Sequence, residues 1–155
     1  MPAKIFYFLA LFSASVALGP ALAHLFELLN KIKLSRADYL TVQQIYTGWA
    51  FLGIVIASAL ISTFVLTILL RKERRPFVFS LIGFLCIAGT QVIFWTYTYP
   101  ANQLTRNWTS LPVNWEQLRL QWEYSHATSA VLNLFAVAAL IASLLTYKEA
   151  ERLIS

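Results

Sequence analysis

The chain has 155 residues, of which 59% are hydrophobic and 12% are charged, and its net charge is +5. Because soluble domains carry about a quarter charged residues, this composition excludes an ordinary soluble protein and favours an integral membrane protein. The basic residues are dispersed or flank apolar segments, a pattern that indicates a lipid bilayer and not nucleic acid as the partner. The single cysteine, Cys86, excludes a disulfide framework, and the length suits one domain over 1–155.

Four apolar segments are long enough to cross a bilayer, which requires about 20 residues of helix. In chain order they cover about 5–29, 45–70, 77–99 and 112–147. Pro76 and Pro100 bracket the third segment, and Ser110 with Pro112 offers an early start for the fourth. The sequence therefore predicts an all-α integral membrane protein, an antiparallel four-helix bundle whose last helix extends beyond the membrane on the outer side.

The first segment also has features of a cleavable signal peptide, namely Lys4, an apolar stretch and the small residues Ala21 and Ala23. The apolar stretch continues beyond that point to Leu29. We therefore expect a retained first helix.

The distribution of lysine and arginine predicts the orientation of the bundle. One side holds seven basic residues, Lys4, Arg71, Lys72, Arg74, Arg75, Lys148 and Arg152. The opposite side holds five, Lys31, Lys33, Arg36, Arg106 and Arg119. The positive-inside rule then predicts that both termini are cytoplasmic, in a bacterial inner (plasma) membrane.

Each of the two histidines has a glutamate three residues away: His24 precedes Glu27, and Glu123 precedes His126. Residues at this spacing share a helix face. The first and fourth helices are neighbours in a closed antiparallel bundle, so the two pairs are expected to converge near the outer end. Glu-x-x-His pairs of this kind hold iron or manganese in bundle proteins.

His24, Glu27, Glu123 and His126 are accordingly candidate ligands for one divalent metal ion, either iron, manganese or zinc. Three alternatives stay open. The four residues could form a polar network without a metal, they could act in cofactor-free catalysis, or the histidines could hold a haem. Haem is less favoured because it leaves the two glutamates unexplained.

Polar residues form one stripe on the last predicted helix, and matching faces occur on the second and third. The stripe consists of Glu116, Arg119, Glu123, His126 and Asn133. The second segment and the residues before it contribute Gln43, Tyr46, Ala50, Gly53 and Ala57. The third contributes Gln91, Trp95, Thr98 and Asn102. Since ionisable groups in a membrane face the bundle interior, we expect Arg119 to pair with Glu116 or Glu123, a polar pocket in the outer half, and apolar packing in the inner half.

The last third of the chain resembles the C-terminal signature of the anthrone oxygenase-like family of small four-helix membrane proteins. The resemblance is carried by Asn102-Gln103, Asn107-Trp108, Trp115-Glu116-Gln117-Leu118-Arg119 and Trp122-Glu123-Tyr124-Ser125-His126. The family is named after fungal members that oxidise anthrones to anthraquinones without a bound organic cofactor. The resemblance implies O₂ chemistry on a flat aromatic substrate. By position, its candidate residues are Asn107, Trp115, Arg119, Trp122, Glu123 and His126.

Two functions are compatible with these observations. The first is an oxidoreductase or oxygenase acting on a lipophilic aromatic substrate, with His126 or His24 as base, Glu123 orienting a histidine, and Arg119 holding an oxyanion. Its substrate pocket would include Tyr46, Trp95, Asn107, Trp115 and Trp122. The second is a non-catalytic membrane subunit or small-ligand binder in which the polar stripe is structural. A homo-oligomer is left open.

Overall fold

The computed structural model describes the backbone of residues 2–154 and the side chains of residues 2–147. All regular secondary structure in the described chain is helical, and the described residues contain no strand. The helices in order are α1 (Pro2–Lys31), α2 (Arg36–Gln43), the 3₁₀ turns η1 (Gln44–Tyr46) and η2 (Trp49–Phe51), α3 (Leu52–Leu69), α4 (Arg74–Ile93), the π-helical turn η3 (Phe94–Thr98), α5 (Tyr99–Leu104) and α6 (Trp115–Ile154).

Four of the described helical segments are long and apolar enough to cross a membrane: Pro2–Lys31, Trp49–Leu69, Arg74–Leu104 and Trp115–Tyr147. Their outward side chains are also apolar; Phe12, Ile54, Leu85 and Phe135 are between 57% and 72% exposed. Soluble proteins rarely expose a continuous apolar surface of this kind to water, whereas the acyl chains of a bilayer solvate it. The prediction of an all-α bundle with four membrane-spanning helices is confirmed.

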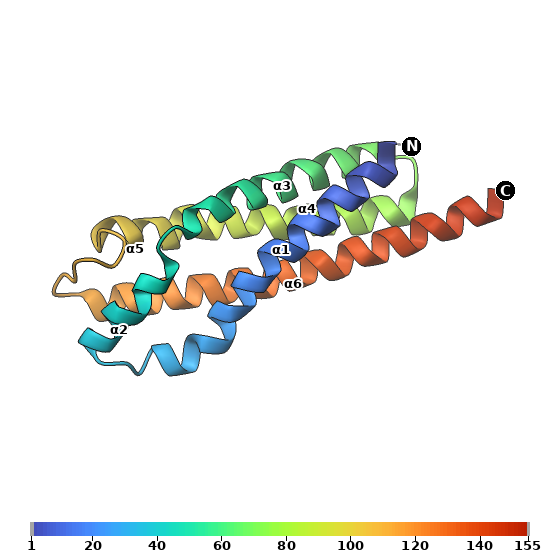
Figure 1. The fold of residues 1–155 in the computed structure, drawn as a ribbon. Coiled ribbons are helices and arrows are strands. Elements are labelled where there is room, and N and C mark those ends of the chain that lie inside the picture. The colour runs from blue at the N-terminus through green and yellow to red at the C-terminus, as the bar shows by residue number, and fades with distance from the viewer. Residues whose placement is uncertain (1, 155) are drawn as a thin grey trace.

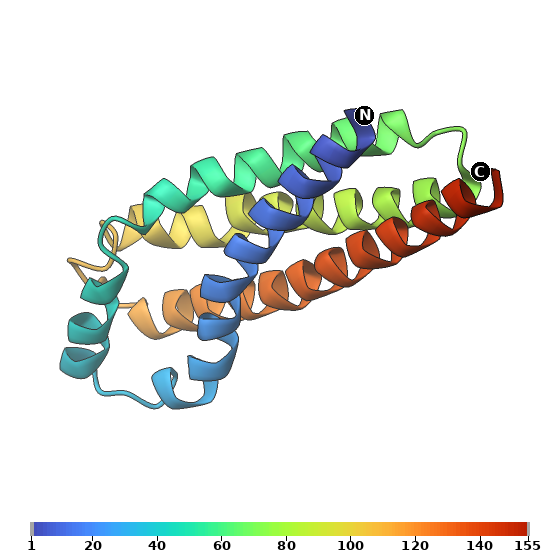
Figure 2. The same cartoon turned by 45° about the vertical axis from the view of Figure 1, so that its right-hand side comes forward.

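The four long helices form a closed ring in which α1 lies between α3 and α6, and α4 lies between α6 and α3 (Figure 1). The described ends of the chain lie at one end of the bundle, beside the turn between α3 and α4. We call this the terminal end, and the opposite end, with α2, α5 and the start of α6, the distal end. Helix α1 crosses α6 obliquely and leaves α3 towards the distal end, where α2 leads the chain back to α3 (Figure 2).

At the terminal end a short chain of hydrogen bonds ties three helices together. The Ser143 hydroxyl donates to the Pro76 carbonyl at 2.8 Å, so the Tyr7 hydroxyl, 2.8 Å from Ser143 Oγ, must be the donor to serine. All of this lies inside the bundle, where Tyr7 is 2% exposed and Ser143 is fully buried. The expected apolar packing of this half is present, with Leu66, Ile87 and Leu140 in its core, and this chain of hydroxyl groups is added to it.

Several helix boundaries differ from the sequence expectation, each for a local reason. The third span does not stop at Pro100, because the π turn at Phe94–Thr98 carries the helical path on to Leu104. Helix α3 begins at Leu52 and not near residue 45, since Gly48 adopts a left-handed φ of 89°. The 30–44 loop contains α2, whose first turn is capped by the Ser35 side chain.

The start of the last helix is later than expected. Arg106, Asn107 and Trp108 have positive φ values of 50–61°, and this compact left-handed turn keeps Ser110 and Pro112 in the loop. Helix α6 begins at Trp115 and is 40 residues long. At 1.5 Å per residue it far exceeds the roughly 20 residues that a bilayer core requires, so the expected extension of the last helix beyond the membrane stands. The side chains of Lys148 and Arg152, used to predict orientation, lie outside the described side chains.

Helices α4 and α6 pack tightly at Gly83, where an added Cβ would lie 3.1 Å from Leu140 Cγ. At Gly53 on α3 an added Cβ would meet nothing within 4 Å. We expect Gly83→Val to lower the free energy of unfolding by about 1–3 kcal/mol, as overpacking typically does, and Gly53→Val to be neutral. Thermal unfolding of the two detergent-purified variants measures the difference. Equal midpoints would contradict the close packing of α4 on α6.

Candidate functional site

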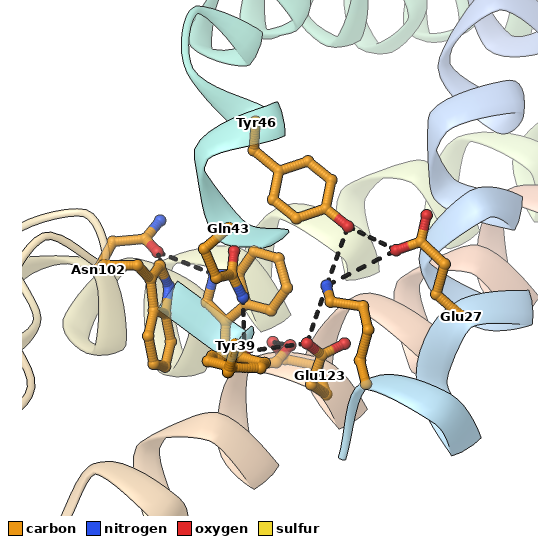
Figure 3. A network of polar contacts seen from close by, with 10 residues as sticks. Glu27, Tyr39, Gln43, Tyr46, Asn102 and Glu123 are labelled. Atoms are coloured by element: carbon orange, nitrogen blue, oxygen red, sulfur yellow. Dashed lines mark hydrogen bonds and ion pairs between the residues drawn. The ribbon is translucent and has the colours of Figure 1, made fainter. Parts of the chain in front are cut away.

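The distal end is organised around the buried ammonium group of Lys31, the last residue of α1, which is 4% exposed. Its Nζ atom lies 2.9 Å from Glu123 Oε1 on α6 and 3.6 Å from Glu27 Oε2 one turn earlier on α1. It also donates a hydrogen bond of 2.9 Å to the Tyr46 hydroxyl (Figure 3). Lys31 is thus a cation held between two carboxylates.

Lys31 was the residue that the sequence reasoning missed, because it counted only as a topology signal. A signal was nevertheless present. Lys31 follows His24 by seven residues and Glu27 by four, so all three share one face of α1.

Glu123 is fully buried on α6 and receives two hydrogen-bond donors on one oxygen. Oε1 accepts from the Lys31 ammonium and, at 2.9 Å, from the Tyr39 hydroxyl of α2. Tyr39 in turn accepts from Gln43 Nε2 (Figure 3). Oε2 has no protein partner in the described part of the chain. Burial of a carboxylate at this depth requires such pairing, since an isolated charge there is very costly.

The two tyrosines that reach this network remain protonated donors. Burial raises the pKa of Tyr46, and so does the hydrogen bond that its hydroxyl donates to Glu27 Oε2. Burial also raises the pKa of Tyr39, and the negative charge of Glu123 raises it further. Each phenol therefore keeps its proton across the physiological pH range and can act as a hydrogen-bond donor in the network.

His24 lies next to this network in a box of aromatic rings. Its ring stacks on His126 with 4.2 Å between centroids, and it lies 4.7 Å from Tyr46, 5.1 Å from Trp122 and 5.7 Å from Trp49. His24 is 4% exposed, and its Nδ1 has no hydrogen-bond partner among the described residues. The structure thus brings together the two histidines that the sequence placed on separate helices.

The four expected metal ligands do not form a metal site. No group of three or more His, Cys, Asp or Glu side chains in the described part of the chain is arranged to hold a metal ion. Lys31 lies between Glu27 and Glu123 and supplies the positive charge that a metal would have supplied there. The imidazoles stack face to face at 4.2 Å, which leaves no room for a haem between them. The residues therefore fit neither cofactor.

Arg119 does not pair with Glu116 or Glu123 as expected. Its Nη1 donates to the Leu34 carbonyl at 2.8 Å, and its guanidinium stacks over Trp115 at 4.6 Å. Glu123 forms its ion pair with Lys31, because the end of α1 lies beside Glu123. Arg119 lies one turn earlier on α6 and contacts the loop after α1. Glu116 is exposed, and Asn133 is half-buried.

Three expectations for the pocket were also wrong. Trp95 is 62% exposed, because it lies three residues after Val92, itself 66% exposed, and so shares the outer face of this span. Asn107 is exposed on the left-handed turn before α6. The small residues of the second span face outward, since the break at Gly48 separates their face from that of Gln43 and Tyr46; they are Ala50, Gly53 and Ala57.

Trp108 and Trp122 share one hydrogen-bond acceptor. Asn102 Oδ1 accepts from Trp122 Nε1 at 2.8 Å and from Trp108 Nε1 at 3.2 Å (Figure 3). Trp108 also packs edge-on against Tyr39, with 5.2 Å between the ring centroids. Asn102 thus fixes the indole of Trp122, which forms one wall of the histidine box.

Comparison of the chain with protein-family models, with curated proteins and with solved structures finds no match. Interpretation of the site therefore depends on its geometry.

A mutant cycle tests the buried ion pair. Lys31→Met leaves the Glu123 carboxylate buried without its cation, and removal of one partner of a buried pair costs about 3–5 kcal/mol. We expect a large fall in thermal midpoint for Lys31→Met and recovery of most of it in Lys31→Met/Glu123→Gln. Lys33→Met, at an exposed lysine of the same turn, is the matched control and should behave as wild type. Additive losses in the double variant would show that the two groups do not interact.

Asn102→Ala removes the acceptor of two buried indole N–H groups, each of which then costs about 1–3 kcal/mol. The neighbouring exposed side chain of Gln103 provides the control variant Gln103→Ala, which we expect to be neutral. Tryptophan fluorescence should shift in Asn102→Ala alone, because the Trp122 indole loses its fixed position. An unchanged spectrum and midpoint would contradict this role of Asn102.

Proposed function

We propose that the protein is a membrane oxidoreductase that oxygenates a lipophilic, planar aromatic substrate with an acidic C–H bond, without an organic cofactor. The observation that carries the proposal is a pair of stacked imidazoles beside a buried ammonium group, enclosed by aromatic rings. This combination offers a base, a fixed positive charge and flat apolar walls in one place. The resemblance to the anthrone oxygenase-like family supports the same class of substrate.

His126 is the proposed base. It is only partly buried, whereas His24 behind it is almost fully enclosed. Removal of the C–H proton gives an enolate, whose oxygen carries the developing charge. In the proposed reaction, the positive charge of the Lys31 ammonium, 2.9 Å from the Tyr46 hydroxyl, stabilises that oxygen electrostatically. The oxyanion role expected for Arg119 thus passes to Lys31, and Glu123 and Glu27 hold Lys31 in position.

The proposed reaction is balanced with O₂ as the only oxidant. The enolate carbon adds to O₂ to give a peroxide, which takes back the proton held by the imidazolium. Loss of water from the resulting hydroperoxide leaves a ketone, so that a CH₂ group and O₂ become C=O and H₂O. The protein supplies proton transfer and charge stabilisation, and the aromatic substrate supplies the electrons.

A second candidate is the non-catalytic role, in which the polar network specifies how the distal helices pack. It is favoured by the saturation of the network: Lys31, Glu123, Tyr39 and Tyr46 bond mainly to one another. Buried ionic groups of this kind contribute little net stability but can fix one arrangement of helices.

Replacement of the proposed base separates the two candidates. His126→Phe keeps a stacked ring and removes the proton acceptor, so we expect oxygen uptake with anthrone to fall by about 10²-fold or more while the thermal midpoint stays close to wild type. Thr128→Val, at an exposed position of the same helix, is the control and should remain active. Oxygen uptake by the wild-type protein should also be unchanged in the presence of a metal chelator.

Oxygen uptake is compared with the spontaneous rate in protein-free micelles. If wild type does not exceed that rate, or if His126→Phe is fully active, the catalytic proposal fails. A fall in the thermal midpoint of His126→Phe without any wild-type activity would favour the structural role.

A further inference from the structure

An apolar groove lies between α4 and α6 on the outer surface of the bundle, away from the Lys31 network. Its volume is about 370 Å³. It is lined by apolar side chains of both helices, including Phe79, Ile82, Cys86, Phe135, Ala138 and Ala142. Ile82 and Phe135 are 42% and 60% exposed, so the groove opens on the surface that faces the acyl chains of the bilayer. The alanines of α6 leave room between the larger side chains.

The two helices that form the groove are fixed relative to each other. The Ser143 hydroxyl of α6 donates to the Pro76 carbonyl of α4, and Gly83 of α4 lies close against Leu140 of α6. The lining residues of α4 lie within 79–86, a length of about 10 Å at 1.5 Å per residue. A preformed groove of this length can receive a segment of an acyl chain with little loss of conformational entropy in the protein.

One cation lies at the terminal end of this groove. Arg75 precedes Phe79 by four residues, so the two residues share a face of α4, with Arg75 one turn closer to the terminal end. Arg75 is exposed, and within the part of the chain that the structure describes its guanidinium has no hydrogen bond or ion pair. Because Arg75 precedes the apolar run of α4 that starts at Phe77, it lies at the level of the lipid headgroups when that run is in the bilayer.

The surroundings of Arg75 favour an anion. The turn between α3 and α4 lies at the same end of the bundle (Figure 1), and its sequence has a single acid, Glu73, beside three further basic residues, Arg71, Lys72 and Arg74. The first turn of α4 contains no acidic residue, and its N-cap forms no side-chain hydrogen bond. The partial positive charge of the helix N-terminus therefore adds to the charge of the arginines.

We propose that this groove binds one phospholipid with an anionic headgroup, with an acyl chain along Ile82 and Ala138 and the phosphate at Arg75. The apolar groove and the cation one turn beyond it match an amphiphile, in which the acyl chain and the phosphate follow in the same order. Clusters of basic residues beside a membrane helix attract anionic headgroups by this chemistry. A zwitterionic lipid fills the same groove but gains less from Arg75, because its own cation offsets the charge of its phosphate.

Native mass spectrometry of the detergent-purified full chain with equal amounts of phosphatidylglycerol and phosphatidylcholine tests the headgroup part of the proposal. We expect wild type to retain more phosphatidylglycerol, and Arg75→Gln to reduce this preference about five-fold, the contribution of one basic residue near a membrane surface. Arg71→Gln removes an equal charge from the α3 side of the same turn, where the guanidinium donates to the Ile68 carbonyl at 3.5 Å, and should leave the preference unchanged. Equal effects of the two changes, or no preference in wild type, would overturn the proposal.

A second set of variants tests the apolar part. Ala138 lines the groove and is exposed, so Ala138→Trp should fill the groove and displace both lipids while the thermal midpoint stays close to wild type. Ala138→Leu fills part of the same space and should weaken the binding of both lipids to a smaller extent. Ala57→Trp adds an indole at an exposed position of α3 and should retain both. Unchanged lipid binding in the two Ala138 variants would contradict the proposal, and none of these results depends on the oxidoreductase activity.

Discussion

The arrangement of the distal end depends on the burial of one ammonium group. A lysine at 4% exposure beside a membrane is tolerated only if its charge is paired and its ammonium group is hydrogen-bonded. Glu123, Glu27 and Tyr46 meet that requirement from α6, α1 and η1. Any arrangement that moved these elements apart would leave a charge without partners in a low-dielectric environment.

This requirement explains why α1 crosses α6 obliquely. The crossing brings the last turn of α1 beside the first turns of α6, and α2 then covers the contact with Tyr39 and Gln43. Gly48, in its left-handed conformation, lets the chain turn from this cover into α3. The aromatic box of His24 and His126 is a consequence of the same crossing, because the two histidines lie on the faces that it brings together.

The two ends of the bundle use polar groups for different purposes. At the terminal end, neutral hydroxyls and a carbonyl tie three helices with ordinary hydrogen bonds, so their burial needs no charged partner. At the distal end the groups are charged, and within the part of the chain that the structure describes, one oxygen of Glu123 and Nδ1 of His24 have no hydrogen-bond partner.

The sequence by itself determined the four apolar helices and placed His24 with Glu27, and Glu123 with His126, on faces of neighbouring helices. Those inferences depend on helical periodicity and on the hydrophobic length of a span, which are local properties. Only the tertiary structure decided that the Lys31 ammonium group lies between the carboxylates of Glu27 and Glu123. Lys31 has a long flexible side chain at a helix end, and its sequence context is the same whether it extends to the headgroups or turns inward. Trp95 shares the outer face of its span with Val92, and composition does not separate that face from the inner one, because aromatic and apolar side chains also face lipid. The crossing angle of α1 is set by packing across the whole bundle, and no local pattern encodes it.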